Sequence, residues 1–439
     1  MKKAAGQICI ILKAILFIGF SIRIVLGLVW MVSHFMEVQE FAPVSSGIYP
    51  LLRQAAGSLS QVLYALQLGA AFGAGWQLFK TLGVSGYLWR IWGTGVLLSF
   101  PLAMQCHLAL LPYSFVSSLV LLELSFCVQA MTENHSLDLV KFVQAGCCML
   151  GLALLLPEYV WLGAIPLVLT VLLRLRKIWA QPKRLLYSCL LVAAFCGVVG
   201  GTGSLLYKGD NLSHGFWASI ASRTAWPTFW VDSSCWSEGL YELVGESALD
   251  IAIRPGNMEQ ILQPLLERKV GAEQSEKYYR ELAAIAWELH RNLILRQVFG
   301  DILIYSAPEA VLQAQLTGVG YDSFSGRNYE MMMMFHPAMT KFYVSYSCWW
   351  FWVSLMLVAL LLLMGLIEGR ERFNRRYLVF GAVAVLWSVV MVLYYTMQGA
   401  GIADYKCTLA IFQLWCVLAV VICHGGLWSE EERHNDGKA

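Results

Sequence analysis

Charge is scarce in this sequence. Only 14% of the residues are charged, whereas 58% are hydrophobic. Several apolar runs reach about 18 residues or more, the length that matches the hydrocarbon layer of a bilayer. These runs exclude a soluble enzyme, a disordered chain and a collagen-like chain. The formal net charge of +2 argues against nucleic acid as a partner, because that usually needs a concentrated basic surface.

Several familiar catalytic motifs are also missing. The sequence has no G-x-x-x-x-G-K-(S/T) loop, no G-x-G-x-x-G after a strand, no H-E-x-x-H and no G-x-S-x-G. Nucleotide-driven pumping, dinucleotide redox chemistry and two hydrolytic mechanisms therefore lose support. Of the twelve cysteines, only Cys235 lies in a polar region, and no C-x-x-C spacing occurs. Neither a disulfide framework nor a zinc site is expected.

The apolar runs predict an all-α polytopic membrane protein with about ten transmembrane helices. Lys2 and Lys3 precede the first run, as in a signal peptide, but that run continues from Ile8 to about Phe35 and is interpreted as a retained span. The predicted spans lie near residues 10–34, 59–79, 91–111, 114–131, 140–156, 158–173, 185–206, 346–366, 377–397 and 406–424.

Basic residues are distributed unequally between the two sets of loops. If the N-terminus is cytoplasmic, the inner loops collect Lys80, Arg90, Arg174, Arg176, Lys177, Lys183, Arg184, Arg370, Arg372, Arg375 and Arg376. The short outer loops hold little beyond Arg53 and Lys406. Cytoplasmic loops of membrane proteins carry the excess of Lys and Arg. The sequence therefore predicts a multi-pass protein of the cell membrane with both termini in the cytoplasm.

One long polar insert interrupts the spans. Residues 207–344 carry 27 of the 60 Asp, Glu, Lys and Arg residues, and apolar residues recur at helical spacing from Glu273 to Val298. The insert is predicted to be mainly helical and extracytoplasmic. The predicted domains are an N-terminal membrane domain of about seven spans with an acidic first outer loop at 35–58 (1–206), the insert (207–344), a C-terminal membrane domain (345–425) and a cytoplasmic tail (426–439).

The first outer loop holds the clearest catalytic candidates. Glu37 and Glu40 lie three residues apart just outside the first span, where a base could meet a substrate that arrives from the lipid. The alternative is a pair of solvated loop charges. Within the spans, Arg23 and Glu123 are the clearest ionisable residues, and each is interpreted either as a helix-packing residue or as part of a transport pathway.

Three segments resemble the GT-C superfamily of polytopic glycosyltransferases, which includes protein mannosyltransferases and aminoarabinose lipid A transferases. They are the first loop, with HFMEVQEF at 34–41 and SGIYPLLR at 46–53, the stretch LLPYSFVSSLVLLELSF at 110–126, and GLALLLPEY at 151–159. The resemblance covers roughly residues 10 to 205. The sequence departs from the family pattern at Glu37, where Asp is more usual, and at Leu156, where Arg or Lys often precedes the proline.

The resemblance implies transfer of a sugar from a polyprenyl-phosphate donor to an acceptor at the outer face of the membrane. Glu37 would then be the general base, and Glu40 would orient the acceptor or help to hold a divalent metal ion as a cofactor. The implied substrate-binding residues are Arg53, Arg223 and Arg327 for the phosphate, and Tyr49 and Trp226 for the sugar. The implied partners are the lipid-linked donor, membrane lipids and an unidentified glycan, lipid or protein acceptor.

Two other functions remain open at this point. One is a transporter or flippase for a lipid-linked or amphipathic substrate, with Arg23 or Glu123 in its pathway. The other is a non-catalytic scaffold derived from the transferase fold, with a partner bound to the 207–344 insert. The candidate substrate-binding residues likewise have a plainer interpretation, because exposed arginines are often surface charges and interfacial aromatics often belong to the membrane belt.

Overall fold

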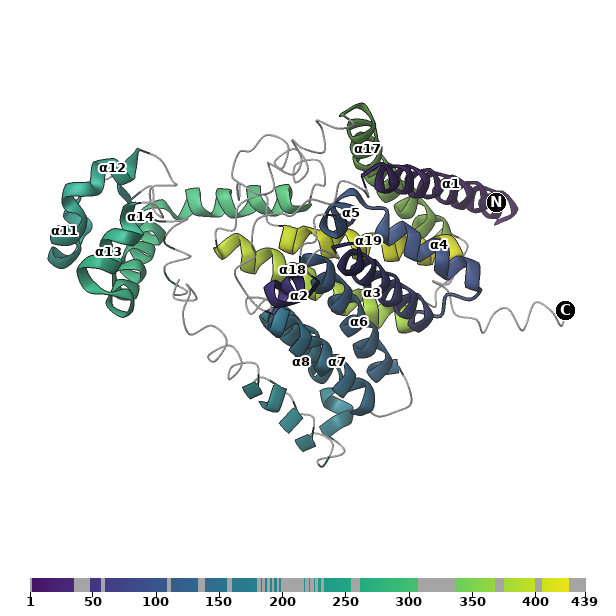
Figure 1. The fold of residues 1–439 in the computed structure, drawn as a ribbon, viewed down its shortest axis with the longest axis horizontal. Helices are drawn as coiled ribbons and strands as arrows, with labels where there is room; N and C mark the ends of the chain where they lie inside the picture. Colours follow the sequence, from purple (N-terminus) through teal and green to yellow (C-terminus); the bar gives the residue numbers. More distant parts are fainter. Residues whose placement is uncertain are drawn as a thin grey trace. The chain divides into compact units, whose positions relative to one another are not determined.

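A computed structural model of the chain describes most of its helices (Figure 1). Its described residues are 2–34, 48–56, 60–108, 112–132, 139–155, 160–179, 233–253, 261–306, 337–367, 375–398 and 405–425, together with single residues between 183 and 229. Every regular element in these ranges is a helix, and no strand occurs among them. The predicted all-α class is confirmed for this part of the chain.

The chain forms two compact units. The first, the membrane unit, comprises Met1–Leu206, Leu312–Val389 and Tyr405–Ala439, and the second, the insert unit, comprises Tyr207–Val311 and Val390–Asp404. The helices that lie wholly or mostly in the membrane unit are α1 (Lys2–His34), α2 (Tyr49–Ala56), α3 (Ser60–Thr81), α4 (Tyr87–Leu98), α5 (Pro101–Leu108), α6 (Tyr113–Thr132), α7 (Leu139–Leu155), α8 (Val160–Trp179), α17 (Pro337–Ile367), α18 (Arg375–Gln398) and α19 (Tyr405–His424).

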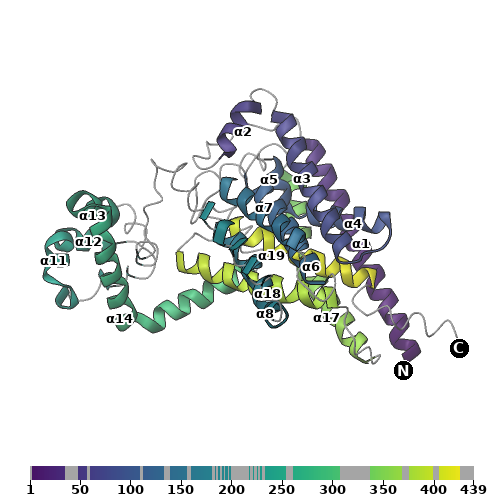
Figure 2. The ribbon, with the colours of Figure 1, turned by 90° about the horizontal axis from the view of Figure 1, so that it is seen from below.

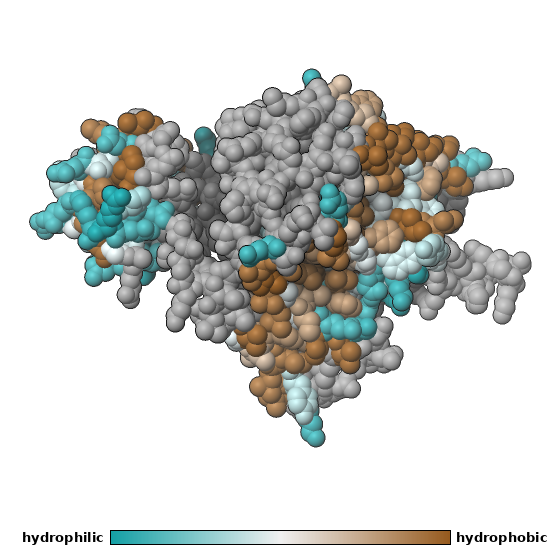
Figure 3. Space-filling view, viewed as in Figure 1, coloured by the Kyte–Doolittle hydropathy of each residue, from teal (hydrophilic) through white to brown (hydrophobic). Residues whose placement is uncertain are grey.

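Four helices in the described residues are long and apolar enough to cross a membrane. Their apolar stretches are Gly6–Val32, Gln61–Thr81, Tyr113–Met131 and Lys341–Gly365, and shorter apolar stretches occur at Val140–Leu155, Gly163–Leu173, Arg376–Val390 and Gln413–His424. Much of this apolar surface faces outward, as the brown atoms over α1 in Figure 3 illustrate. Ile10 and Val32, for example, are 69% and 68% exposed. Such a surface is stable in lipid rather than in water, which indicates a multi-pass membrane protein.

The structure divides the predicted span at 91–111 into two helices, α4 and α5. Helix α4 ends at Leu98, Ser99 is its C-cap, and Pro101 begins α5. Proline has no backbone N–H, and it disfavours helical geometry in the residue before it, so the helix stops here. A helix that ends inside the bundle leaves carbonyl oxygens without intrahelical partners.

Arg23 of α1 supplies hydrogen bonds at this break. Its Nη2 donates to the carbonyl oxygen of Val96 at 2.6 Å, and its Nε donates to Ser99 Oγ at 3.3 Å. Nη2 also lies 3.4 Å from Cys416 Sγ of α19. The side chain is 1% exposed. A cation beside the carbonyl end of a helix is stabilised by the helix dipole, so Arg23 acts as a structural link between α1, α4 and α19.

Substitutions at Arg23 should distinguish its hydrogen-bond geometry from its charge. We expect Arg23→Lys to destabilise the bundle more than Arg23→Met, because a single ammonium cannot reach all three acceptors and leaves a buried charge poorly solvated. Methionine removes that charge, and the hydroxyls of Ser99 and Tyr343 still donate to the carbonyls of Val96 and Ser99. Denaturation of the detergent-solubilised variants in SDS shows which of the two variants is less stable. Equal stability of the two variants would contradict this account.

Basic side chains gather at one end of the membrane unit, which we call the basic end. Here Ser85 Oγ of the α3–α4 turn lies 3.1 Å from His424 Nε2 at the end of α19, and Arg90 Nε donates to Val84 O at 2.8 Å. The Cys423 thiol donates to the carbonyl oxygen of Lys13 in α1 at 3.5 Å. Helices α1 and α4 lie side by side in both ribbon views (Figure 1, Figure 2). The basic residues Lys13, Lys80, Arg90 and Arg376 belong to this end, because each contacts either the α3–α4 turn or the end of α19.

The insert unit is a small helical domain with its own core. It contains α11 (Glu238–Val244), α12 (Ala248–Ala252), α13 (Gln263–Val270) and α14 (Ala272–Ser306), and two short 3-10 helices at Ser233–Cys235 and Gly245–Ser247. Leu240, Leu266 and Leu282 are fully buried in that core. The Glu281 carboxylate accepts hydrogen bonds from the N–H and hydroxyl of Ser237, the N-cap of α11. Helix α14 covers the predicted helix and is kinked at His290, a bend visible in Figure 2.

Candidate functional site

The candidate site lies at the end of the membrane unit opposite the basic end. A buried cluster, which we call the upper cluster, joins six helices here: its members are Trp30, Tyr49, Leu63, Tyr64, Met104, Leu155 and Tyr343. Trp30 is 17 residues beyond Lys13 along α1, a rise of about 25 Å, so the two ends of the unit are separated by nearly the thickness of a bilayer core. The ring centroids of Trp30 and Tyr343 are 5.7 Å apart.

Two hydrogen bonds hold the start of α2 in this cluster. The N–H of Ile48 donates to the carbonyl oxygen of Leu154 in α7 at 2.9 Å. Gln67 Nε2 of α3 donates to the Tyr49 hydroxyl at 2.9 Å, and the Tyr49 ring lies 6.4 Å from Phe115 of α6, edge to face. Residues 35–47, which carry Glu37 and Glu40, are therefore joined at both ends to helices of the upper cluster.

The three segments that carry the family resemblance meet at this cluster. Ile48 and Leu154 join the first loop segment to the 151–159 segment, and Tyr49 with Phe115 joins it to the 110–126 segment. A Cβ placed on Gly151 would lie 3.1 Å from Leu119 Cδ1, so α6 and α7 approach closely where the other two segments touch. Nothing in the sequence indicates that the first loop segment lies beside the other two segments.

Most of the predicted site residues lie outside the described residues. These are Glu37, Glu40, Arg223, Trp226 and Arg327. Arg53 belongs to α2, but the structure does not describe its side chain. Tyr49 is described, and its ring is 1% exposed. In this conformation Tyr49 is a packing residue of the upper cluster, and its predicted role in sugar stacking would require the ring to be uncovered.

A divalent metal ion would need ligands beyond the two loop glutamates. Two carboxylates are a thin site, since Ca²⁺ takes six to eight oxygen ligands and Mg²⁺ also requires a filled octahedral shell. Among the described residues, no group of three or more His, Cys, Asp and Glu side chains could hold a metal ion.

Glu123 is the second buried ionisable residue of the spans. It lies in α6 with 0% exposure, and within the described part of the chain neither carboxyl oxygen has a hydrogen-bond partner. Cys127, one turn further along α6, and Cys148 of α7 are close enough for the carboxyl group to interact with them electrostatically. A carboxyl group without partners is costly in an apolar interior, so Glu123 is a functional candidate in its own right.

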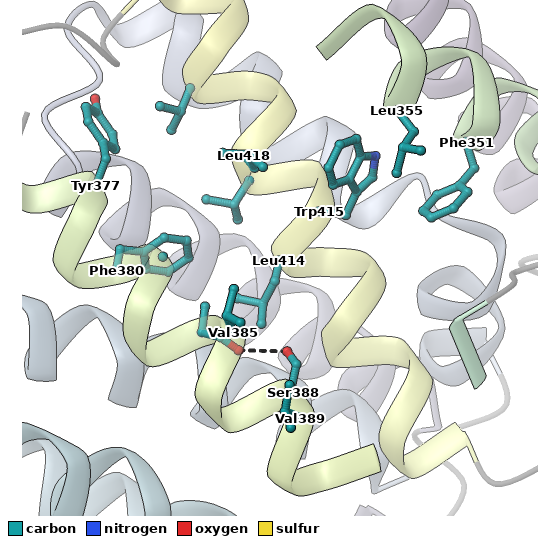
Figure 4. A pocket seen from close by; sticks show the side chains of 14 residues that line it. Phe351, Leu355, Tyr377, Phe380, Val385, Ser388, Val389, Leu414, Trp415 and Leu418 are labelled. Atoms are coloured by element: carbon teal, nitrogen blue, oxygen red, sulfur yellow. Dashed lines mark hydrogen bonds between the residues drawn. The ribbon is translucent and has the colours of Figure 1, made fainter. Parts of the chain in front are cut away.

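An apolar groove lies between α17, α18 and α19, away from the upper cluster (Figure 4). Its volume is about 360 Å³, and carbon atoms form nearly all of its wall. Sequence reasoning missed this groove, because residues on three helices form it and each helix looks uniformly apolar. The one local signal is Gly381, where a Cβ would meet no atom within 4 Å.

Comparison with protein-family models, with curated proteins and with solved structures finds no match for this chain.

Proposed function

We propose that the protein is a membrane glycosyltransferase of the GT-C type. It would move a sugar from a polyprenyl-phosphate donor to an acceptor at the outer face of the membrane. One observation carries the proposal: the three segments that resemble the family, far apart in sequence, touch one another at the upper cluster. A transfer site assembled from these segments would need this proximity.

The proposed reaction places Glu37 as the general base. Its carboxylate takes the proton from an acceptor hydroxyl, whose oxygen attacks the anomeric carbon of the donor sugar. The bond between that carbon and the phosphate oxygen breaks, and polyprenyl phosphate leaves with both bonding electrons. An arginine among Arg53, Arg223 and Arg327 would neutralise the phosphate, because a guanidinium binds two phosphate oxygens at once. Glu40 would orient the acceptor, and Tyr49 and Trp226 remain the candidates for sugar contacts.

The proposal includes a topology of about ten spans with both termini in the cytoplasm. Lys13, Lys80, Arg90 and Arg376 all belong to the basic end, whereas the first loop joins the upper cluster. If the basic end faces the cytoplasm, as the positive-inside rule requires, Glu37 and Glu40 face outward. The insert at 207–344 would then be extracytoplasmic and could supply a lid, an acceptor surface or phosphate contacts.

Turnover by the intact protein tests the proposal. The full chain is reconstituted in proteoliposomes with polyprenyl-phosphate donors whose hexose, hexosamine or pentose is radiolabelled, and a membrane extract supplies the acceptors. We expect the label to leave one donor class while an equal amount of polyprenyl phosphate appears. Label that stays on every donor would refute the transferase proposal. Label that crosses the membrane on an intact donor would instead establish transport.

The buried Glu123 carboxyl group favours transport or lipid flipping as the second candidate function. Ionisable side chains inside the membrane often mark substrate or ion pathways. The two functions differ in their response to Glu123→Gln, a nearly isosteric change that removes the acid. Under the transferase proposal, sugar transfer in the same assay remains unchanged. Loss of movement of the intact donor across the membrane, in a variant that stays folded, would assign Glu123 to a transport pathway.

A further inference from the structure

The groove between α17, α18 and α19 has the composition of a hydrocarbon-binding site. Figure 4 shows Phe380 of α18, Leu418 of α19 and Leu355 of α17 around it. Its volume of about 360 Å³ falls in the range of small-ligand pockets. Burial of a hydrocarbon chain in such a groove requires no polar contacts, so the groove selects for an apolar ligand.

The two clearest polar side chains at the groove are satisfied within the protein. The Ser388 hydroxyl donates to the carbonyl oxygen of Ala384 at 2.7 Å, the dashed line in Figure 4. The Trp415 indole N–H donates to Ser354 Oγ at 3.3 Å. Neither group therefore has to be paired by a ligand, and an aliphatic chain can occupy the groove without leaving either of these two donors unpaired.

The groove opens sideways, where a chain could enter from the bilayer. Val385 and Val389 of α18 are 62% and 51% exposed although they line it. Its wall extends along α18 from Tyr377 to Val389, a rise of about 18 Å at 1.5 Å per residue. One leaflet of a bilayer contributes about 15 Å of hydrocarbon. The groove is thus as long as one acyl chain of a single leaflet.

An exposed arginine, Arg376, comes directly before the residue that lines one end of the groove. Tyr377 lines that end, and its neighbour Arg376 is exposed at the basic end of the membrane unit. Arg376 Nη1 would lie 3.7 Å from a Cβ on Gly83, so the guanidinium stands beside the α3–α4 turn. A guanidinium can hold two oxygens of a phosphodiester, which an ammonium does less well.

We propose that this groove binds one acyl chain of an anionic phospholipid, with the lipid phosphate held by Arg376. Two observations carry the inference: the apolar groove is about as long as one leaflet is thick, and Arg376 directly precedes the residue that lines its end nearest the basic end. The site is separate from the proposed transfer site, because its headgroup end is the basic end and the first loop joins the upper cluster. It therefore stands whether or not the protein transfers sugar.

Photocrosslinking of the full chain in nanodiscs tests the site. Phosphatidylglycerol and phosphatidylcholine probes carry a diazirine in the acyl chain, and mass spectrometry locates the labelled peptides. We expect phosphatidylglycerol to label α18 and α19 peptides of the groove, with competition by unlabelled phosphatidylglycerol. Gly381→Leu should abolish that labelling, because Gly381 lines the groove and a Cβ at this position has no atom within 4 Å, so the larger side chain would take up groove space. Arg376→Gln should reduce the preference for phosphatidylglycerol about fivefold, the effect of one cation near the surface.

Gly73→Leu is the matched control, because a Cβ on Gly73 of α3 also meets nothing within 4 Å and lies outside the groove. The probes should label this variant in the same way as the wild type. Three results would overturn the proposal: undiminished labelling in Gly381→Leu, equal labelling by the two probes, or uniform labelling of all exposed helices. The last result would mean that only the general lipid layer contacts these helices. Circular dichroism of each variant reports whether its helices remain folded.

Discussion

Gly19→Ala is expected to destabilise the membrane unit by about 3 kcal/mol, because a methyl group on α1 would overlap the Trp350 indole of α17. Trp350 cannot easily move aside. It is 4% exposed, its ring is stacked on Tyr346 with an interplanar angle of 5°, and Phe20 meets it edge to face. Separation of the two helices would also lengthen the hydrogen bond of 2.9 Å from the Tyr346 hydroxyl to the carbonyl oxygen of Gly19.

SDS-induced unfolding of the purified protein measures this loss. Gly69→Ala of α3 is the control, because its added methyl group meets nothing within 4 Å and alanine favours the helix by up to about 1 kcal/mol. We expect the control to be as stable as the wild type or slightly more stable. If Gly19→Ala unfolds at the same SDS concentration as the control, the close approach of α1 and α17 at Trp350 is not a determinant of stability.

The helical class and membrane character could be predicted from the sequence because both depend on local composition. An apolar run of span length has few alternatives to a helix in lipid, since only a helix satisfies its own backbone polar groups within one segment. In the polar insert, the helical spacing of apolar residues at Glu273–Val298 correctly predicted part of α14, because that spacing places them on one face of a helix. The exact number of spans depends on packing and on short helices, and ten spans remain a prediction.

The break between α4 and α5 shows what local patterns leave out. Hydropathy is continuous from 91 to 111, so the sequence reads as one span, although Pro101 was available as a signal. The break is stabilised by Arg23, which lies 76 positions from Ser99 in the sequence. Such a contact cannot be inferred from the periodicity of either segment. The structure thus explains a charge in α1 that the sequence could only interpret as packing or transport.

The candidate site was only partly predictable as well. Glu37 and Glu40 stand out in the sequence because charge is rare around them, but no sequence pattern indicates which helices lie beside their loop. The hydrogen bond from Ile48 to Leu154 and the burial of Tyr49 arise from contacts between distant segments. Those contacts show which residues surround the ends of the loop. The roles assigned to Glu37 and Glu40 themselves remain predictions.

The second large expected effect is a loss of sugar transfer in Glu37→Gln. A general base contributes about 100-fold to 10,000-fold to a rate, and glutamine cannot accept the acceptor proton. Glu37→Asp should retain measurable activity, because aspartate is still a base and its carboxylate is withdrawn by only about one methylene. All variants should unfold at the same SDS concentration as the wild type. Glu242→Gln, at an exposed acid of the insert unit, is the control for loss of an unrelated negative charge.

The most direct test of the transfer site is the initial rate of sugar transfer by Glu37→Gln and wild-type protein in the same proteoliposomes. The proposal predicts that Glu37→Gln is at least about 100-fold slower while Glu242→Gln matches the wild type. Transfer by Glu37→Gln at the wild-type rate would show that Glu37 is not the general base. That result would contradict the proposed transfer site at the upper cluster, which depends on Glu37 as its base.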